Sequence, residues 1–208
     1  DSNSAKSFWE STFKDFSSPF LFNPNQQKTK TLVQNHIELS EETSLKAQEL
    51  AKTYRTTLNT VFQALWSLVI SKYSDAYDIA YGNTVSGRSG DFPNIELMSG
   101  MFSNVLPVRT KLDPNSNIKD WIKSFQLQQL EARTYEHVTI NEITEWVDIN
   151  SNTLFDSLFI FENFPWEDIK SGELTVKQFE SGITSNYPLT FIVRIEEGLS
   201  FDIISDSN

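Results

Sequence analysis

The sequence predicts a mixed α/β fold, with one sheet and flanking helices, from three observations. Apolar residues in 118–125 recur at spacings of three, four and seven, which is typical of a helix. Segment 187–203 alternates apolar and polar residues around a central turn and predicts a hairpin with one buried face. Segment 154–161 is almost continuously apolar and predicts a strand covered on both faces. No interior boundary is evident, so residues 1–208 are treated as one unit.

The first part of the chain predicts a helix, a loop, a strand and a second helix. A short amphipathic helix is expected over 7–16, a loop over 17–29 and a strand over 31–39. Ser40 is then a helix N-cap, because a hydroxyl followed by two glutamates suits the helix dipole. Leu45 is expected on the buried face of this second helix.

A further helix is predicted around Thr60, which has capping-box spacing with Gln63. Two apolar stripes run along it, and a helix that is apolar nearly all round belongs in the interior of its domain. The stripes consist of Leu58, Val61, Leu65 and Leu68, and of Phe62, Trp66, Val69 and Tyr73.

The C-terminal part predicts a long helix whose tail reaches His137. Thr139 and Glu142 repeat the capping-box spacing and open another helix, with Ile140 and Ile143 inside. An outer strand is expected at 175–179, before the hairpin.

Segment 81–109 is the most informative stretch. It leaves a strand at Gly82, turns at Gly87, passes a short helical piece at 94–98 and re-enters a strand at 102–108. The loop carries small polar groups and one cation, namely Asn83, Thr84, Ser86, Arg88, Ser103 and Asn104. A donor-rich loop between rigid strands is where function is usually found, although an ordinary surface crossover is the competing interpretation.

Composition narrows the class of function. The net charge is −11 and no stretch concentrates Lys or Arg, which argues against nucleic acid as a partner. The chain has no Cys, so thiolate chemistry and disulfides are excluded and a cytoplasmic location is expected. The apolar runs are too short to span a membrane. Because the first residue is Asp1, the chain is expected to be a piece of something longer.

The residues offer donors but no convincing base. The two histidines are His36, expected on a strand, and His137, whose neighbour Glu136 points in a different direction on a helix. Glu136 is interpreted, with Glu41 and Glu42, as a solvated helix end. No spacing of carboxylates and histidines predicts a metal site, and no phosphate-binding glycine loop is present.

Several blocks resemble, in order, the C-terminal motifs of nonribosomal peptide synthetase condensation domains. These blocks are GNTVSGR, IELMSGMFSNVLPVR, RTYEHVTINEI, LFDSLFIFEN and NYPLT. The resemblance covers nearly the whole chain and implies one lobe of a two-lobed, V-shaped, chloramphenicol acetyltransferase-like domain with a tunnel between the lobes. The family's HHxxxDG motif belongs to the N-terminal lobe and does not occur here. The resemblance therefore implies that the chain is the C-terminal lobe, without catalytic residues of its own and inactive alone.

The implied reaction is amide formation between two carrier-bound thioesters. Phosphopantetheine arrives on upstream and downstream carrier proteins, while this chain binds no cofactor or metal itself. The implied partners are the N-terminal lobe, both carrier proteins and an adjacent adenylation domain. Ser86 would lie near the acceptor amine or its arm, and Asn104 would face the tunnel, with Asn83 and Thr84 beside them.

Gly82, Gly87 and Arg88 are expected to structure the loop, with Arg88 clamping it to neighbouring carboxyl or carbonyl groups. Three positions depart from the family pattern, namely Ser89, Ser103 and Val105. They leave loop stiffness and tunnel polarity open. A non-catalytic docking platform remains the alternative function, and the intact TVSGR and LPVR blocks argue against an epimerisation domain.

Overall fold

The computed structural model describes residues 2–16, 19–23, 31–88, 94–95, 98–147, 149, 153–163, 169–171, 174–176, 185–195 and 198–206. The helices are α1 (Ser2–Thr12), α2 (Glu41–Tyr54), α3 (Leu58–Ser74), α4 (Ile118–Arg133) and α5 (Ile140–Trp146). The strands of the main sheet are β1 (Leu32–Glu38), β2 (Asp78–Val85), β3 (Asn104–Lys111), β4 (Ser157–Glu162), β7 (Leu189–Ile195) and β8 (Leu199–Asp206). A separate hairpin consists of β5 (Ile169–Ser171) and β6 (Leu174–Val176).

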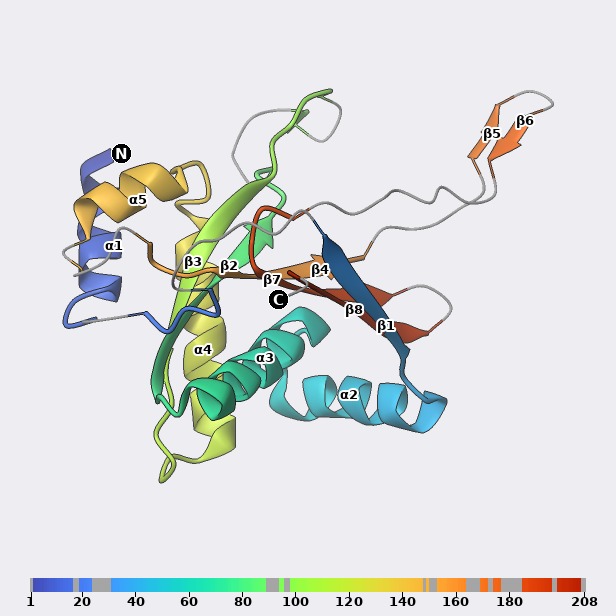
Figure 1. Ribbon diagram of the computed structural model, residues 1–208, viewed down its shortest axis with the longest axis horizontal. Coiled ribbons are helices and arrows are strands. Elements are labelled where there is room, and N and C mark those ends of the chain that lie inside the picture. Colours follow the sequence, from blue (N-terminus) through green and yellow to red (C-terminus); the bar gives the residue numbers. More distant parts are fainter. Residues whose placement is uncertain are drawn as a thin grey trace.

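The main sheet is mixed, as predicted, with the strand order β1-β8-β7-β4-β2-β3 (Figure 1). The strand β4 lies parallel to both β2 and β7, and the other neighbours are antiparallel. Parallel pairing at the centre requires long crossover connections: β3, α4 and α5 separate β2 from β4 along the chain, and the β5–β6 hairpin lies between β4 and β7.

The two faces of the sheet are covered by different helices. Tyr81 of β2 faces α3, where its hydroxyl donates to the Gln63 carbonyl oxygen at 3.2 Å. Burial raises the pKa of the Tyr81 phenol, so it stays a neutral donor. On the opposite face Arg109 of β3 donates to Asp78 and to the carbonyl oxygens of Thr12 and Lys14, at the end of α1. The helices α3 and α1 therefore lie on opposite sides of β2 and β3.

Several predictions from local sequence are confirmed. Ser40 caps α2 by accepting a hydrogen bond from the Thr43 N–H. Thr139 and Glu142 form a full capping box on α5, and the hydrogen bonds from Thr139 lower the pKa of Glu142. The strand β4 is buried on both faces in its first half, because Leu158 and Phe159 point to opposite sides and are 8% and 0% exposed.

The predictions for α3 were wrong in two respects. The N-cap is Thr57, whose hydroxyl accepts from the Thr60 N–H at 3.1 Å, and Thr60 is already inside the helix. The helix is not buried all round, because one face carries exposed apolar side chains, and this set is called the α3 apolar stripe. It consists of Leu65, Leu68, Val69 and Tyr73, which are 45%, 40%, 44% and 78% exposed.

Other boundaries and burial predictions also need correction. The first helix begins at Ser2 instead of Ser7, and α4 ends at Arg133, before the turn that holds His137. Leu45 is 51% exposed on α2.

The β7–β8 hairpin has buried residues on both faces. Ile192 and Val193 point to opposite faces and are both fully buried, so the prediction of a single buried face was wrong. The alternating pattern misled because some of its polar residues are also buried, such as Asp202, which pairs with Arg194. The expected outer strand is found as β6, and residues 177–179 of that prediction lie outside the described residues.

Candidate functional site

The strand β2 does not break at Gly82. It continues to Val85, so Gly82, Asn83 and Thr84 belong to a strand paired with β3. A Cβ on Gly82 would lie 2.4 Å from Cε2 of Phe155, so this glycine admits a packed ring instead of turning the chain. The loop therefore begins only at Ser86.

Gly87 does turn the chain. Its φ is +66°, and a Cβ there would lie 1.8 Å from the carbonyl oxygen of Phe102. A side chain is thus excluded both by backbone conformation and by close contact. The turn brings the end of β2 next to the entry of β3.

Arg88 connects this turn to the returning part of the loop. Its Nη1 donates to the carbonyl oxygens of Ile95 at 2.6 Å and Met98 at 2.9 Å. Its Nη2 lies 3.5 Å from the carbonyl oxygen of Gly100, and the guanidinium stacks over the Phe102 ring at 4.5 Å. Arginine suits this position because its planar fork reaches several carbonyl groups at once. Residues 89–93 and 96–97, including Ser89, lie outside the described residues.

Ser86 is exposed beside this turn. Its hydroxyl accepts a hydrogen bond from the Arg88 N–H at 3.4 Å. The hydroxyl proton remains available to a group approaching from solvent.

Asn104 has hydrogen bonds that tie β3 to the turn between α4 and α5. Its Nδ2 donates to the carbonyl oxygens of Glu136 at 2.8 Å and Val138 at 2.7 Å, and its Oδ1 accepts from the Val105 N–H. Both amide protons are thereby occupied within the chain. Glu136 is 6% exposed, so the interpretation of this residue as a solvated helix end was wrong; Asn104 holds its backbone against the sheet.

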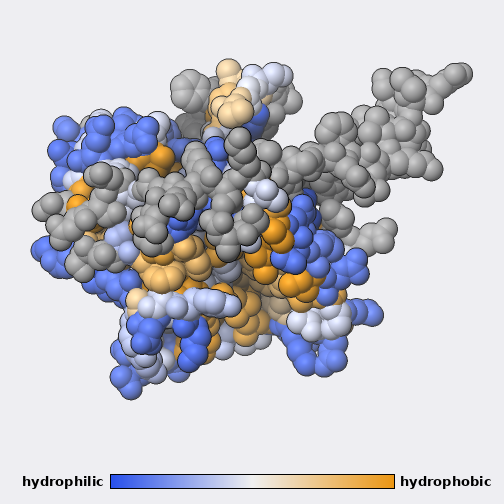
Figure 2. Space-filling view, viewed as in Figure 1, coloured by the Kyte–Doolittle hydropathy of each residue, from blue (hydrophilic) through white to orange (hydrophobic). Residues whose placement is uncertain are grey.

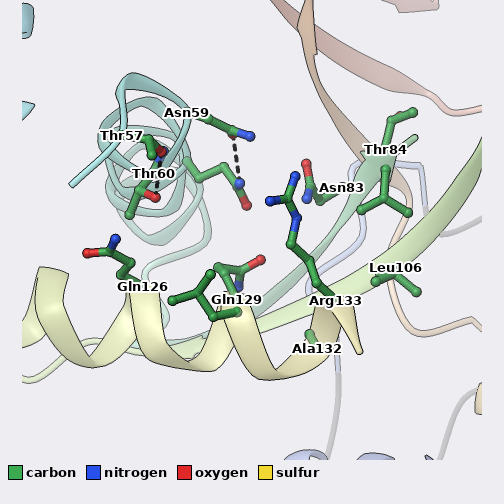
Figure 3. A pocket seen from close by; sticks show the side chains of 13 residues that line it. Thr57, Asn59, Thr60, Asn83, Thr84, Leu106, Gln126, Gln129, Ala132 and Arg133 are labelled. Atoms are coloured by element: carbon green, nitrogen blue, oxygen red, sulfur yellow. Dashed lines mark hydrogen bonds between the residues drawn. The ribbon is translucent and has the colours of Figure 1, made fainter. Parts of the chain in front are cut away.

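A cavity of about 80 Å³ lies between the first turns of α3, the end of β2 and the second half of α4 (Figure 3). Asn83 is 7% exposed and its Oδ1 forms no hydrogen bond within the described chain. Thr84, Val85 and Leu106 complete the strand side. The helix side is mostly polar, with Leu130 and Ala132 as its apolar members, and its polar residues are Thr57, Asn59, Thr60, Gln63, Gln126, Gln129 and Arg133.

Sequence reasoning singled out Asn83 and Thr84 but missed the polar helical side of this cavity. Gln126, Gln129 and Arg133 recur at spacings of three and four, so they share one face of α4. Asn59 and Gln63 are likewise four apart on α3, and the Gln63 Nε2 donates to the Asn59 Oδ1 at 2.8 Å. The available signals were Asn59 and Gln63 at helical spacing on the largely apolar α3, and the glutamines at spacing three on α4.

Neither histidine is positioned as a base for this site. His36 lies on β1, at the far end of the sheet order from β2 and β3, and its Nδ1 is 2.9 Å from Oδ1 of Asp202. His137 is exposed on the turn after α4. Among the described contacts no hydrogen bond joins either ring to Ser86, and neither lines the cavity.

The described residues contain no group of three or more potential metal ligands of the His, Cys, Asp or Glu type. No helix within the described ranges combines the length and apolar character that a membrane crossing requires. What the loop and the cavity offer is hydrogen-bond donors, acceptors and two guanidinium groups, those of Arg88 and Arg133.

A family profile described as "Condensation domain" matches residues 1–206. Chondramide synthase cmdD of Chondromyces crocatus is 37% identical over 201 residues, covering 93% of this chain and 5% of the synthase. Bacitracin synthase 3 of Bacillus licheniformis is 30% identical over 217 residues, covering 100% of this chain and 3% of that synthase. The chain thus spans a small fraction of these relatives.

Solved structures share the fold at low sequence identity. The condensation domain from Monacolin K polyketide synthase MokA superposes with a TM-score of 0.75 at 13% identity, covering 99% of this chain and 52% of that one. The first condensation domain of the calcium-dependent antibiotic synthetase, in complex with substrate analogue 2a, gives 0.73 at 15% identity, covering 98% and 46%. The chain therefore spans about half the length of these solved proteins.

Proposed function

Because the chain belongs to the condensation domain family, we propose that it supplies one wall and the covering loop of a tunnel in which a peptide synthetase forms an amide bond. The downstream carrier-bound amine attacks the upstream thioester carbonyl, a C–N bond forms, the C–S bond breaks and the thiol leaves with the proton. The substrates travel on phosphopantetheine arms of two carrier proteins, next to an adenylation domain, in the cytoplasm.

The observation that carries the proposal is the family match over nearly the whole chain, combined with coverage of only about half of the solved condensation proteins. A lobe of this kind needs a second lobe to enclose a tunnel. The α3 apolar stripe supports this, because a row of exposed apolar side chains is a surface that gains free energy from being covered (Figure 2).

In the described site no histidine is positioned to act as a general base, and we use this to assign the catalytic roles to the two lobes. Amide formation needs a neutral, oriented amine and stabilisation of the oxyanion of the tetrahedral intermediate. Ser86 offers an exposed hydroxyl beside the turn at Gly87, but the two histidines are elsewhere. We assign proton handling to the HHxxxDG motif of the other lobe.

The test compares the 208-residue chain alone with a two-lobed protein that joins it to an N-terminal lobe bearing HHxxxDG. Both are given carrier proteins loaded with aminoacyl thioesters, and the carrier-bound dipeptide is measured by mass spectrometry. We expect product only from the two-lobed protein. Dipeptide formed above background by the 208-residue chain alone contradicts the proposal. If the natural upstream sequence carries a degraded HHxxxDG, the chain belongs to a docking platform instead.

The proposed roles of Ser86 and Arg88 separate in the two-lobed protein. Ser86→Ala is expected to lower the rate of dipeptide formation by roughly tenfold, the value of one hydrogen bond, with no change in Tm. Arg88→Ala is expected to lower Tm as well, because three carbonyl contacts and the Phe102 stack are lost. A rate loss in Arg88→Ala without a loss of thermal stability contradicts the structuring role.

A further inference from the structure

The cavity between α3, β2 and α4 contains an acceptor that the described chain leaves unsatisfied. The Asn83 side chain is more than nine-tenths buried and its Oδ1 accepts no hydrogen bond from any described residue. An unpaired acceptor at such depth costs free energy, and in native proteins it commonly marks a missing water, ion or ligand.

A cationic donor lies across the cavity from this acceptor. Figure 3 shows the Arg133 guanidinium extending from α4 toward Asn83. Arg133 is exposed and donates only, whereas the buried Asn83 Oδ1 only accepts. A group that bridges the two must therefore both donate and accept.

Water and hydroxyl groups can do both, and among the groups of a carrier-bound acyl substrate an uncharged amide does so through two adjacent atoms. An ammonium group could donate to Asn83 but would be repelled by Arg133. A carboxylate could accept from Arg133 but has no proton for the Asn83 Oδ1. An amide donates through its N–H and accepts through its carbonyl oxygen, and it leaves no charge buried.

The size of the cavity limits the ligand to one such group. About 80 Å³ is well below the roughly 300–1,000 Å³ of pockets that enclose a drug-sized molecule. It has room for a few water molecules or one short polar group. A longer ligand would place a single amide here and extend out of the cavity.

We propose that this cavity is an amide subsite, in which a ligand N–H donates to Asn83 Oδ1 and the ligand carbonyl accepts from Arg133. The inference rests on the proposed function, because the carrier-bound substrates bring amides to the protein. Those amides belong either to the phosphopantetheine arm or to the aminoacyl and peptidyl chain, and both share this chemistry.

The test follows the side-chain NH₂ signals of Asn83 and Gln63 in ¹⁵N-labelled protein during titration with N-methylacetamide. We expect saturable shifts of both signals. Methyl acetate, which lacks the N–H, should bind about tenfold more weakly, as expected for one lost hydrogen bond. Binding of acetate more tightly than N-methylacetamide shows an anion site and overturns the proposal. Unmoved signals with every probe show a cavity that holds water only, and also overturn it.

Two variants exclude a purely structural role for Asn83. Asn83→Leu removes the unsatisfied acceptor at similar volume, so Tm is expected to hold or rise while the Kd for N-methylacetamide rises at least about tenfold. The matched control is Asn35→Leu on exposed β1, which should leave the Kd unchanged. A fall in Tm for Asn83→Leu with an unchanged Kd contradicts the subsite.

A last pair of probes distinguishes the two sources of the amide. Pantetheine represents the arm and N-acetylglycine N-methylamide represents the aminoacyl chain, and the one that binds more tightly identifies the source. These titrations use the 208-residue chain without any partner lobe. If no probe binds but the two-lobed protein makes dipeptide, the subsite is wrong and the proposed function stands. If a probe binds but the two-lobed protein makes no dipeptide, the subsite stands and the proposed function is wrong.

Discussion

At Gly82, an aromatic ring from a distant part of the chain fills the space that a side chain would need. Phe155 precedes β4, yet its Cε2 occupies the position that a Gly82 Cβ would need, and Val105 Cγ1 would lie 2.9 Å from that Cβ. Both contacts lie inside the sheet, where packing is dense and atoms yield little.

Replacing Gly82 by alanine is therefore expected to lower the free energy of unfolding by about 1–3 kcal/mol through overpacking. Urea unfolding followed by tryptophan fluorescence measures the change. Gly198→Ala is the matched control and should have little effect, because nothing lies within 4 Å of the added Cβ. Adding Phe155→Leu should restore part of the loss. Equal stability of Gly82→Ala and the unmodified chain contradicts this packing.

Two buried aspartates have pKa shifts of opposite sign. Burial tends to raise the pKa of Asp202, but hydrogen bonds from Arg194 at 2.7 Å and His36 at 2.9 Å outweigh it and lower the pKa overall. Arg194 also pairs with Glu162, so one charged chain crosses β4, β7, β8 and β1. For Asp156, burial outweighs the hydrogen bonds from Asn23 and other backbone N–H groups and raises the pKa.

These shifts predict opposite dependences of stability on pH. The Asp202 contribution is present above the unfolded pKa of about 3.9 and is lost as pH falls through the lower folded value. The Asp156 contribution is present below about pH 3.9 and is lost as pH rises through its higher folded value. Asp202→Asn should lower stability at pH 7 and flatten the acid loss, whereas Asp156→Asn should raise stability at pH 7. The free energy of unfolding in urea, measured between about pH 3 and 7, tests both expectations. If it depends on pH in the same way for the unmodified chain, Asp202→Asn and Asp156→Asn, the assignment is contradicted.

At the scale of the element, α3 has two distinct faces. Phe62, Trp66 and Ile70 pack into the core, and Trp66 stacks on Phe191 of β7 with centroids 4.7 Å apart. The α3 apolar stripe lies away from this core, and no described part of the chain buries it. A helix with both faces apolar needs cover on both sides.

The uncovered stripe is expected to make the 208-residue chain self-associate, and charging the stripe should lower that association. The double variant Leu65→Lys with Leu68→Lys should shift sedimentation velocity toward monomer and weaken binding to an N-terminal lobe. Its free energy of unfolding should stay within about 0.5 kcal/mol, because both positions are exposed. Leu45→Lys is the control at similar exposure on α2. Equal association of the two variants contradicts a role for the stripe.

Elements that depend on local chemistry were predictable from sequence. The Ser40 cap, the Thr139–Glu142 capping box and the doubly covered β4 all follow from neighbouring residues. The continuation of β2 through Gly82 was not, because its cause is Phe155, far along the chain. Burial along α3 also failed, since apolar periodicity cannot tell which face meets the sheet and which meets a partner.

The candidate site was predictable only in part, because segments that are distant in the sequence come together to form it. Asn83 was recognised as a polar group between apolar runs, but the cavity requires α3 and α4 to converge on it. The expectation that Asn104 faces the tunnel stays a prediction, but its hydrogen bonds to the backbone at Glu136 and Val138 were not foreseen. Sequence patterns identify polar residues but not the partners that satisfy them.

At the scale of the whole molecule, three features lie around the six-stranded sheet: the loop after β2, the polar cavity between α3, β2 and α4, and the α3 apolar stripe. None of the described groups joins a histidine to Ser86. We therefore place the donors on this chain and the proton-handling group on a second lobe.

The most direct test is the rate of carrier-bound dipeptide formation in a two-lobed protein in which His36 and His137 are both replaced by alanine. We expect a rate within about twofold of the unmodified protein, after correction for any loss of folded protein through the His36–Asp202 contact. Replacing the second histidine of HHxxxDG in the other lobe should abolish the rate. A collapse of the rate in the variant without His36 and His137, with its fold intact, would contradict this division of labour between the lobes.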